Sequence, residues 1–233
     1  MVDAALGHGC KAVYFDLETT GVGPEAKITC GATANSDGTV DVWHGPGGET
    51  MPKEVAQKLA TALLAADEVY TFNGAAFDLR LLYELSQVGE LRTLASTHRD
   101  VMVDFWADNR YFTSMDSLAT PSLGLGKSNN GAWAATAWFD GEHEAVLEYC
   151  KRDVEVLRDL VQRAQRFGKL KRTSKAGRTS TWVLPSLNGQ VRTVAEAFEN
   201  VAPVPRWMSK APGPGPDLGW TTQITPRVSE HPL

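Results

Sequence analysis

Long apolar runs are missing from this sequence of 233 residues, since no stretch reaches the roughly 18 consecutive apolar residues that a membrane-spanning helix needs. Its first residues, MVDAALGHGCKAV, lack the basic flank and the long apolar core of a signal peptide. Cysteine is scarce, with only Cys10, Cys30 and Cys150, an odd number at no metal-ligand spacing. We therefore expect a cytoplasmic protein with no membrane partner, no disulfide framework and no zinc site.

Basic residues are in the minority, with 23 Lys and Arg against 28 Asp and Glu and a formal net charge of −5. This total argues against a polyanionic partner. Residues 166–192, however, hold seven of the basic residues and no acidic one. Such a segment is either a solvated loop or hairpin or a contact for a phosphate backbone, because a local patch attracts polyanions whatever the total charge. Trp182 within it either packs against its own domain or stacks on a base.

The composition, 42% hydrophobic and 22% charged, is that of a globular chain and excludes disorder as the main state. Proline is concentrated late in the chain, where seven of the twelve prolines lie from Pro203 onward. The stretch PVPRWMSKAPGPGP is typical of extended, polyproline-like chain. We predict one domain over residues 1–165, a basic extension over 166–202 packed on or next to it, and a Pro-rich tail over 203–233 that is either a tether or a surface strap.

The pattern of the first 165 residues predicts an α/β fold. Short β-branched and aromatic runs between turn signals indicate strands, and apolar residues at a 3.6-residue period indicate helices. The predicted strands are 11–18, 27–34, 39–44, 68–72 and 100–105, and the predicted helices are 52–66, 77–88 and 142–165. Three adjacent antiparallel strands followed by alternating helices and strands predict a mixed five-stranded sheet flanked by helices, with the basic extension as a hairpin.

The first predicted strand carries two carboxylates on one face. Side chains alternate along a strand, so Asp16 and Glu18 point to one side and Val13, Phe15 and Leu17 to the other. Neighbouring acids repel each other unless a cation or solvent compensates. The pair therefore indicates either a divalent-metal site or an exposed acidic end of the strand.

Two further elements carry acids in positions that suit the same site. Asp78 follows a strand and falls in the first turn of the next helix, and Asn73 before it is an N-cap, a turn residue or a ligand contact. Tyr149 and Asp153 are spaced i, i+4 and share a face of the long helix. Read alone, Asp78 is explained by the helix dipole and Asp153 by pairing with a basic residue at the edge of the apolar stripe.

Together, three segments resemble the motifs of the DEDD, or DnaQ-like, 3′–5′ exonucleases. They are FDLETTG at 15–21, FNGAAFD at 72–78 and YCKRD at 149–153. Tyr149, four residues before the last acid, matches the tyrosine subgroup, whereas the position of the histidine subgroup holds Glu148. The resemblance covers about residues 11–165, and SLGLGKSNNG at 122–131 also resembles stand-alone members of this superfamily. It implies a ribonuclease H-like fold for this domain.

The resemblance also implies a chemistry. Asp16, Glu18, Asp78 and Asp153 would bind two Mg²⁺ ions, with Mn²⁺ as a substitute. Asp16 would bridge both ions, Glu18 and Asp153 would lie on the side of the attacking water, and Asp78 would be in the outer shell of the second ion. Tyr149 would orient that water, because a phenol with a pKa near 10 is a poor base at pH 7. The products would be nucleoside 5′-monophosphates.

The expected substrate is nucleic acid, foremost the 3′ end of single-stranded DNA, with RNA as the other possibility. Predicted substrate contacts are Leu17, Thr19, Thr20, Asn73, Phe77 and Lys127. Thr19 is otherwise a turn residue, Phe77 a core residue and Lys127 part of a solvated loop. Predicted backbone contacts are Lys169, Lys171, Arg172, Lys175 and Arg178.

Several alternatives share this site. They are a structure-specific endonuclease, an RNA-trimming nuclease, and a non-catalytic module that binds nucleic acid or a polymerase. A polymerase or a repair or replication protein is a further possible partner, and any proofreading would act in trans because the sequence holds no polymerase domain.

Overall fold

The computed structural model describes residues 11–125, 131–186, 188–208, 213–222, 224 and 227. Its centre is a five-stranded sheet in the order β3-β2-β1-β4-β5. The strands are β1 (Ala12–Thr19), β2 (Ile28–Asn35), β3 (Val40–His44), β4 (Glu68–Thr71) and β5 (Arg99–Asp100). β1, β2 and β3 pair antiparallel, while β4 and β5 continue the sheet in parallel register from β1. The predicted mixed sheet is confirmed.

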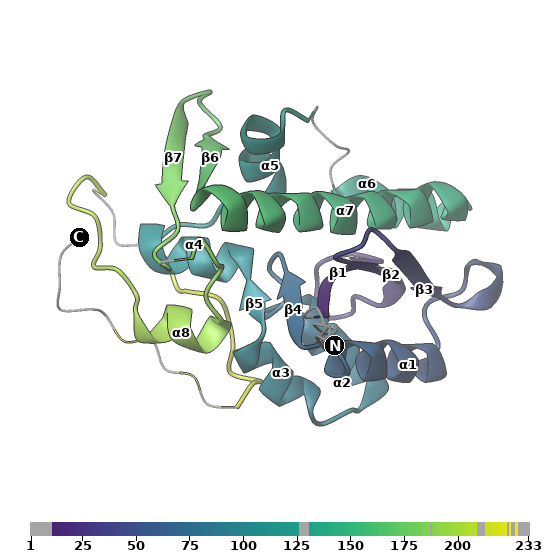
Figure 1. The fold of residues 1–233 in the computed structure, drawn as a ribbon. Coiled ribbons are helices and arrows are strands. Elements are labelled where there is room, and N and C mark those ends of the chain that lie inside the picture. Colours follow the sequence, from purple (N-terminus) through teal and green to yellow (C-terminus); the bar gives the residue numbers. More distant parts are fainter. Residues whose placement is uncertain are drawn as a thin grey trace, which may run out of the picture.

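Helices cover both faces of this sheet (Figure 1). One face carries α1 (Lys53–Leu64), α2 (Asp78–Ser86) and α3 (Leu91–Thr97), and the other carries α5 (Met115–Leu123), α6 (Gly131–Phe139) and α7 (His143–Phe167). The alternation along β1 divides the core accordingly, because Val13, Phe15 and Leu17 pack in the cluster under α1 and α2. Tyr14 packs in the cluster under α7. The acids of β1 therefore face α7.

The predicted strand over residues 100–105 is wrong in most of its length. Only Arg99–Asp100 form β5, and α4 (Val101–Asn109) begins at once. Asp100 is the N-cap of α4, since its carboxylate accepts hydrogen bonds from the backbone N–H groups of Met102 and Val103. The apolar run VMVDFW was predicted as a strand because α4 is buried on nearly all sides.

The basic extension forms the predicted hairpin. Its strands are β6 (Lys169–Thr173) and β7 (Thr179–Val183), which pair antiparallel as a separate two-stranded sheet. Trp182 is 5% exposed, lies edge-on to Phe105 with ring centroids 5.2 Å apart, and donates a hydrogen bond from Nε1 to Asp108 (2.8 Å). Trp182 therefore packs against its own domain, and its alternative use as a stacking surface for a base is wrong.

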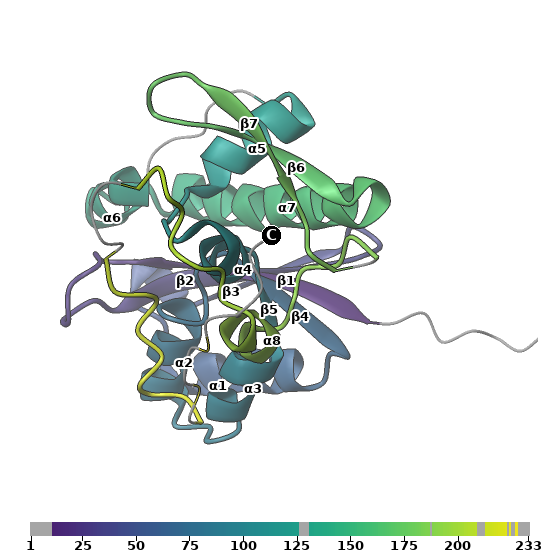
Figure 2. The same cartoon turned by 90° about the vertical axis from the view of Figure 1, so that its left-hand side faces the viewer.

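The chain after the hairpin returns to the sheet edge through α8 (Val194–Glu199), which packs on α4. The stretch 213–222 then runs beside α2 as a strap (Figure 2). Leu218 is buried, and the Trp220 ring stacks on Tyr83 while its Nε1 donates to the carbonyl of Ala75 (3.0 Å). The strap thus contacts the loop that precedes α2. No helix among the described residues combines the length and apolarity needed to cross a bilayer.

Candidate active site

β1 brings two acids to the sheet face below α7. Asp16 is partly buried and Glu18 is 7% exposed. β1 lies between β2 and β4, so these carboxylates stand near the middle of the sheet and away from its edges. A buried carboxylate needs a compensating group. None of the ion pairs formed by the described residues includes either acid.

Asp78 reaches the same place from the other side of β1. It is the first residue of α2, is 4% exposed, and accepts a hydrogen bond from the backbone N–H of Leu17 (3.1 Å). Leu17 lies between the two acids of β1. One hydrogen bond therefore fixes the third carboxylate against the strand that carries the first two.

The loop before Asp78 is held by Asp100, a residue that the sequence motifs did not identify. Its carboxylate accepts hydrogen bonds from the backbone N–H groups of Asn73 (3.0 Å) and Ala75 (2.9 Å), in addition to those of α4. Thr71 also donates to it (3.1 Å). The backbone of this loop passes very close to Thr71, because a Cβ placed on Gly74 would lie 2.5 Å from the Thr71 Cβ. Asp100 therefore positions the loop that leads into Asp78.

α7 supplies the fourth acid and the tyrosine. Asp153 is 8% exposed and Tyr149 is partly buried one turn earlier, and their side chains are hydrogen-bonded to each other. Trp133 of α6 lies edge-on to the Tyr149 ring with centroids 5.8 Å apart. The sequence motifs did not point to Trp133. It restricts the ring that carries the hydroxyl.

The four carboxylates share one electrostatic environment. Burial and the neighbouring acids Asp78, Glu18 and Asp153 raise the pKa of Asp16 well above its ordinary value. Burial and the charge of Asp153 raise the pKa of Glu18 to about 9. Burial raises the pKa of Asp78 and of Asp153 to about 7. The structure therefore brings together the acids of all three motifs, in a site that favours either bound protons or bound cations.

Tyr149 faces the same negative charges. Burial, then the charges of Asp153 and Glu18, raise the pKa of its hydroxyl far above the ordinary value. In the metal-free protein the phenol is therefore protonated throughout the physiological range and is a hydrogen-bond donor. The role of Tyr149 in orienting water stays a prediction.

Cys150 also reaches the cluster, although the spacing of the cysteines gave no sign of it. One ligand atom each of Asp16, Glu18 and Cys150 lie within 4.8 Å of one another. The thiol donates weakly to the carbonyl of Asp16 (3.8 Å), and its hydrogen bond with Cys30, together with burial, raises its pKa well above the ordinary value. Mg²⁺ and Mn²⁺ prefer oxygen ligands to sulfur, so we interpret this buried thiol as packing beside the carboxylates.

The predicted substrate contacts surround the end of β1. Leu17 is buried in the core under α1, and Phe77 is partly buried against the same core. Thr19 donates to the carbonyl of Gly21 (2.7 Å), and Thr20 accepts from the backbone N–H of Lys27 (3.0 Å). Both hydroxyls thus make local turn contacts. Substrate contact by these four side chains stays a prediction.

Two further predicted contacts have different outcomes. Asn73 has a positive φ of 71°, and the N-cap position of α2 belongs to Phe77. Asn73 is therefore a turn residue, because asparagine tolerates the left-handed conformation, and its proposed role as N-cap is wrong. Lys127 lies outside the described residues.

The predicted backbone contacts all lie on or next to the hairpin. Lys169, Lys171, Lys175 and Arg178 are exposed, whereas Arg172 is partly buried. These five residues form no ion pair with a described acidic residue. They do not join the carboxylate cluster.

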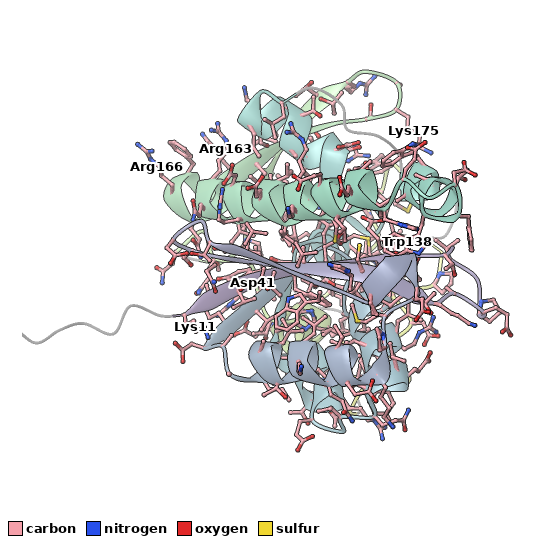
Figure 3. The ribbon with its side chains drawn as sticks, turned by 90° about the vertical axis from the view of Figure 1, so that its right-hand side faces the viewer. Lys11, Asp41, Trp138, Arg163, Arg166 and Lys175 are labelled. Carbon is pink, nitrogen blue, oxygen red and sulfur yellow. The ribbon has the colours of Figure 1, made fainter. Side chains whose placement is uncertain are left out.

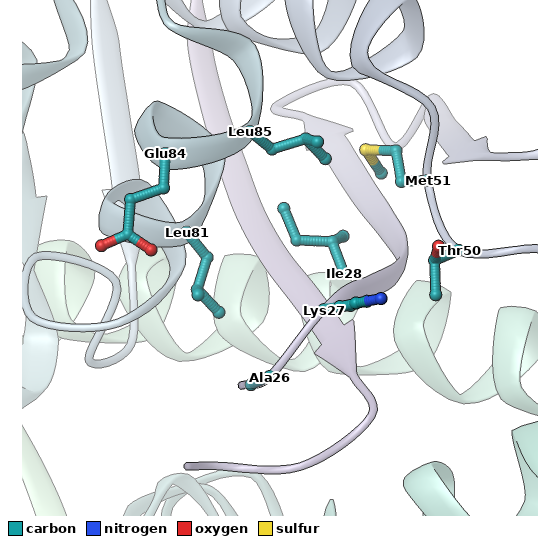
Figure 4. Close-up of a pocket in the computed structure, with 8 residues that line it drawn as sticks. All are labelled: Ala26, Lys27, Ile28, Thr50, Met51, Leu81, Glu84 and Leu85. Carbon is teal, nitrogen blue, oxygen red and sulfur yellow. The ribbon is translucent and has the colours of Figure 1, made fainter. Parts of the chain in front are cut away.

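An apolar pocket of about 260 Å³ opens near the end of β1 but on the opposite face of the sheet from the acids (Figure 4). Its lining includes Ile28 and Met51, which belong to the core cluster under α1 and α2, and the helix residues Leu81 and Leu85. None of the predicted site residues that the structure describes lines it. A much smaller recess lies beside Asp153, between α5 and α7.

The raised pKa values predict an unusual pH dependence of stability. Above about pH 5 the unfolded chain has released the protons of Glu18, Asp78 and Asp153. The folded metal-free chain holds the protons of Asp78 and Asp153 up to their pKa of about 7, and that of Glu18 up to its pKa of about 9. The free energy of unfolding in EDTA should therefore fall as the pH rises, by on the order of 1.4 kcal/mol per pH unit for each group.

Urea unfolding at several pH values measures this effect. Asp153→Asn should flatten the slope, and saturating Mg²⁺ should stabilise the wild type most at high pH, where it need not displace protons. A free energy of unfolding that rises with pH between 6 and 9 in EDTA would contradict the assigned burial of these acids.

Comparisons with known proteins agree with this architecture. A family model described as RNase_H superfamily matches residues 13–165. Among solved structures, the family B DNA polymerase from the hyperthermophilic archaeon Pyrobaculum calidifontis is similar, with 18% identity and a TM-score of 0.50. The match covers 67% of this chain and 24% of the polymerase, so the chain spans about a quarter of that protein's length.

A product-bound structure of exonuclease I also matches, with 13% identity and a TM-score of 0.36, over 67% of this chain and 43% of that chain. No curated protein sequence matches this chain.

Proposed function

The chain belongs to the RNase H superfamily, and on this premise we propose that it is a metal-dependent 3′–5′ exonuclease of the DEDD type, tyrosine subgroup. It would hydrolyse the last phosphodiester bond of a nucleic acid, foremost single-stranded DNA, and release nucleoside 5′-monophosphates. Residues 1–165 would form the catalytic domain. The observation that carries the proposal is the convergence of four carboxylates from β1, α2 and α7 with Tyr149 beside them.

The donor set fits hard divalent cations. Carboxylate oxygens are the ligands that Mg²⁺ and Mn²⁺ prefer. The four largely buried acids form no ion pair with a described basic residue, so they need other positive charge to ionise together. Asp16, Glu18, Asp78 and Asp153 would hold the ions. When bound, the metals would lower the pKa of an attacking water and stabilise the leaving oxygen.

The protein's own residues would position the reactants. The hydroxyl of Tyr149, held by Asp153 and by the Trp133 ring, would orient the water by donating or accepting a hydrogen bond. The turn with Thr19 and Thr20 at the end of β1 would receive the terminal nucleotide. Leu17, Phe77 and Asn73 would support its pocket.

Replacing Tyr149 tests the orienting role. Tyr149→Phe keeps the ring against Trp133 but removes the hydroxyl, so kcat should fall about 10- to 100-fold while KM and the Mg²⁺ dependence stay the same. Tyr83→Phe, which changes a tyrosine of α2 outside the cluster, is the matched control and should retain wild-type rates. An unchanged kcat in Tyr149→Phe would remove this residue from the mechanism.

Labelled substrates test the activity itself. The purified protein is incubated with 5′-labelled linear DNA, 5′-labelled linear RNA and circular single-stranded DNA, with Mg²⁺ or with EDTA. A stepwise ladder from the linear substrates, seen only with Mg²⁺, is expected, and the relative rates show whether DNA or RNA is preferred. Cleavage of the circle would indicate an endonuclease, and binding without cleavage would indicate a non-catalytic module.

A further inference from the structure

A second surface feature lies outside the acidic cluster, between the hairpin and the chain that follows α8. It is a groove of about 440 Å³, which we call the aromatic–basic groove. Of the residues that the structure describes, six line it: Tyr111, Arg172, Ser174, Ala176, Arg178 and Trp207. Its wall is made by three stretches far apart in the sequence, so no local sequence motif predicts the groove.

The groove is positively charged. Among the described residues, Arg172 and Arg178 line it and no acid does. Neither arginine forms an ion pair with a described acidic residue. Lys175 at the hairpin turn and Arg206 next to Trp207 are exposed and add to the same charge. A ligand that neutralises this groove must therefore be anionic.

The groove also offers aromatic faces. Trp207 is 70% exposed, although a large apolar ring usually finds cover, and it meets Tyr111 edge-on with centroids 6.0 Å apart. The guanidinium of Arg172 lies 4.8 Å from the centre of the Tyr111 ring and donates from Nε to Thr113. Tyr111 and Arg172 are thus fixed in place, while Trp207 leaves a flat ring open to solvent.

One helix, α5, contacts the surroundings of both the acids and the hairpin. Met115 and Asp116 in its first turn border the recess beside Asp153. Farther along the same helix, Ser122 exchanges hydrogen bonds with the backbone of Lys171 in β6 (2.8 and 3.0 Å). A strand that leaves the acidic site along α5 therefore arrives at the hairpin.

From these observations we propose that the aromatic–basic groove binds single-stranded nucleic acid, with an unpaired base stacked on Trp207 and phosphates bound by Arg172 and Arg178. Exposed aromatic rings beside cations are the pattern that holds single strands, since every base has a face for stacking and every phosphate a charge. A duplex keeps its bases stacked on each other and cannot use the ring. The groove would hold the part of the substrate that precedes its 3′ end, and this assignment rests on the proposed exonuclease function.

Binding in the absence of catalysis tests this groove directly. Fluorescein-labelled (dT)20 and (U)20 are titrated with the full-length protein in EDTA. Trp207→Ala should weaken binding of both by about 5- to 100-fold, the usual effect of losing one stacked base. Arg178→Ala should weaken binding and reduce the salt slope by about 0.7, the value of one phosphate contact on a single strand.

The C-terminal end of α7 provides a matched control. There the guanidinium of Arg163 lies 4.9 Å from the centre of the exposed Phe167 ring, but the surrounding pocket includes Asp159. Arg163 projects from the C-terminal part of α7, at the opposite side of the view from Lys175 (Figure 3). Phe167→Ala and Arg163→Ala should leave the affinity for (dT)20 unchanged.

Three results would overturn the proposal. The first is that Trp207→Ala binds both oligonucleotides with wild-type affinity. The second is that Phe167→Ala loses as much affinity as Trp207→Ala. The third is that Trp207→Ala loses a similar factor in affinity for heparin, which has charge but no bases. Hydrolysis of the p-nitrophenyl ester of thymidine 5′-monophosphate separates this outcome from failure of the proposed function. Cleavage of this single nucleotide by the wild type reports on the acidic site alone, because the ester has no further nucleotides that could occupy the groove. A wild type without any nuclease activity but with Trp207-dependent binding would refute the exonuclease and retain the groove.

Discussion

Asp16→Asn should abolish Mg²⁺-dependent release of nucleotides, with a loss in rate of at least about 1000-fold. Asp16 is central to the cluster, since the charges of Asp78, Glu18 and Asp153 all act on it. Removing its charge takes away a ligand that both ions would share, and metal stabilisation of a transition state contributes several kcal/mol, each 1.4 kcal/mol being tenfold in rate. The measurement is the rate of mononucleotide release from a 5′-labelled strand at saturating Mg²⁺.

The control for this variant is Asp41→Asn. Asp41 is an exposed acid in β3 (Figure 3), which is separated from β1 by β2 in the same sheet. It should keep the wild-type rate. Asp16→Asn should also remain folded and become more stable in EDTA at high pH, because one of the mutually repelling charges is gone. Undiminished nuclease activity in a pure preparation of Asp16→Asn would show that the site is assigned wrongly.

Asp100→Ala should lower the free energy of unfolding by about 3–5 kcal/mol, the largest loss of stability that we expect from a single substitution. The Asp100 carboxylate is fully buried and accepts hydrogen bonds from four backbone N–H groups, two in the loop before Asp78 and two at the start of α4. Each donor left unpaired in the interior costs about 1–3 kcal/mol, with partial relief if water enters. Urea unfolding measures the loss.

Asp37→Ala is the matched control for Asp100→Ala. Asp37 also accepts a hydrogen bond from a backbone N–H, that of Thr39, but in an exposed turn where water can replace it. We expect little change in this control. A loss for Asp100→Ala no larger than that of Asp37→Ala would show that the loop before Asp78 is held by other contacts, such as Trp220.

The sheet could be predicted because its strands are separated by clear turn signals and alternate between two apolar faces. Val13, Phe15 and Leu17 identify one face of β1, and the acids between them identify the other. The prediction failed at residues 100–105 because α4 is buried on nearly all sides and lacks the polar face by which a helix is recognised. The N-cap residue Asp100 was the available signal for the start of that helix.

The acids of the site could be predicted because three short motifs place them at the ends of a strand and on helices. The contacts that hold these acids in place could not be predicted from the sequence. The contacts come from residues that are distant in the sequence or belong to another helix. Asp100 is 22 residues from Asp78, Trp133 lies on α6, and Trp220 lies in the strap, so no spacing rule connects them with the motifs. The aromatic–basic groove is of the same kind, since Tyr111, Arg172 and Trp207 meet only in three dimensions.

The structure shows where the basic and the acidic residues of the chain are concentrated. The acid-free segment 166–192 contains a hairpin with two arginines that line a groove and form no ion pair with a described acid. Four of the 28 acidic residues are collected in one largely buried cluster. The net charge of −5 therefore gives no guidance about the partner. Local charge, together with exposed aromatic rings, identifies the surface that fits a polyanion.

The central claim is that the four carboxylates form a divalent-metal site for a nucleotide. Crystals of the protein soaked with Mn²⁺ and thymidine 5′-monophosphate test it most directly, because Mn²⁺ is located by its anomalous scattering. We predict two Mn²⁺ peaks among Asp16, Glu18, Asp78 and Asp153, with the phosphate of the nucleotide against them and its sugar at Thr19. Fully loaded crystals with no Mn²⁺ at these four carboxylates would contradict the account.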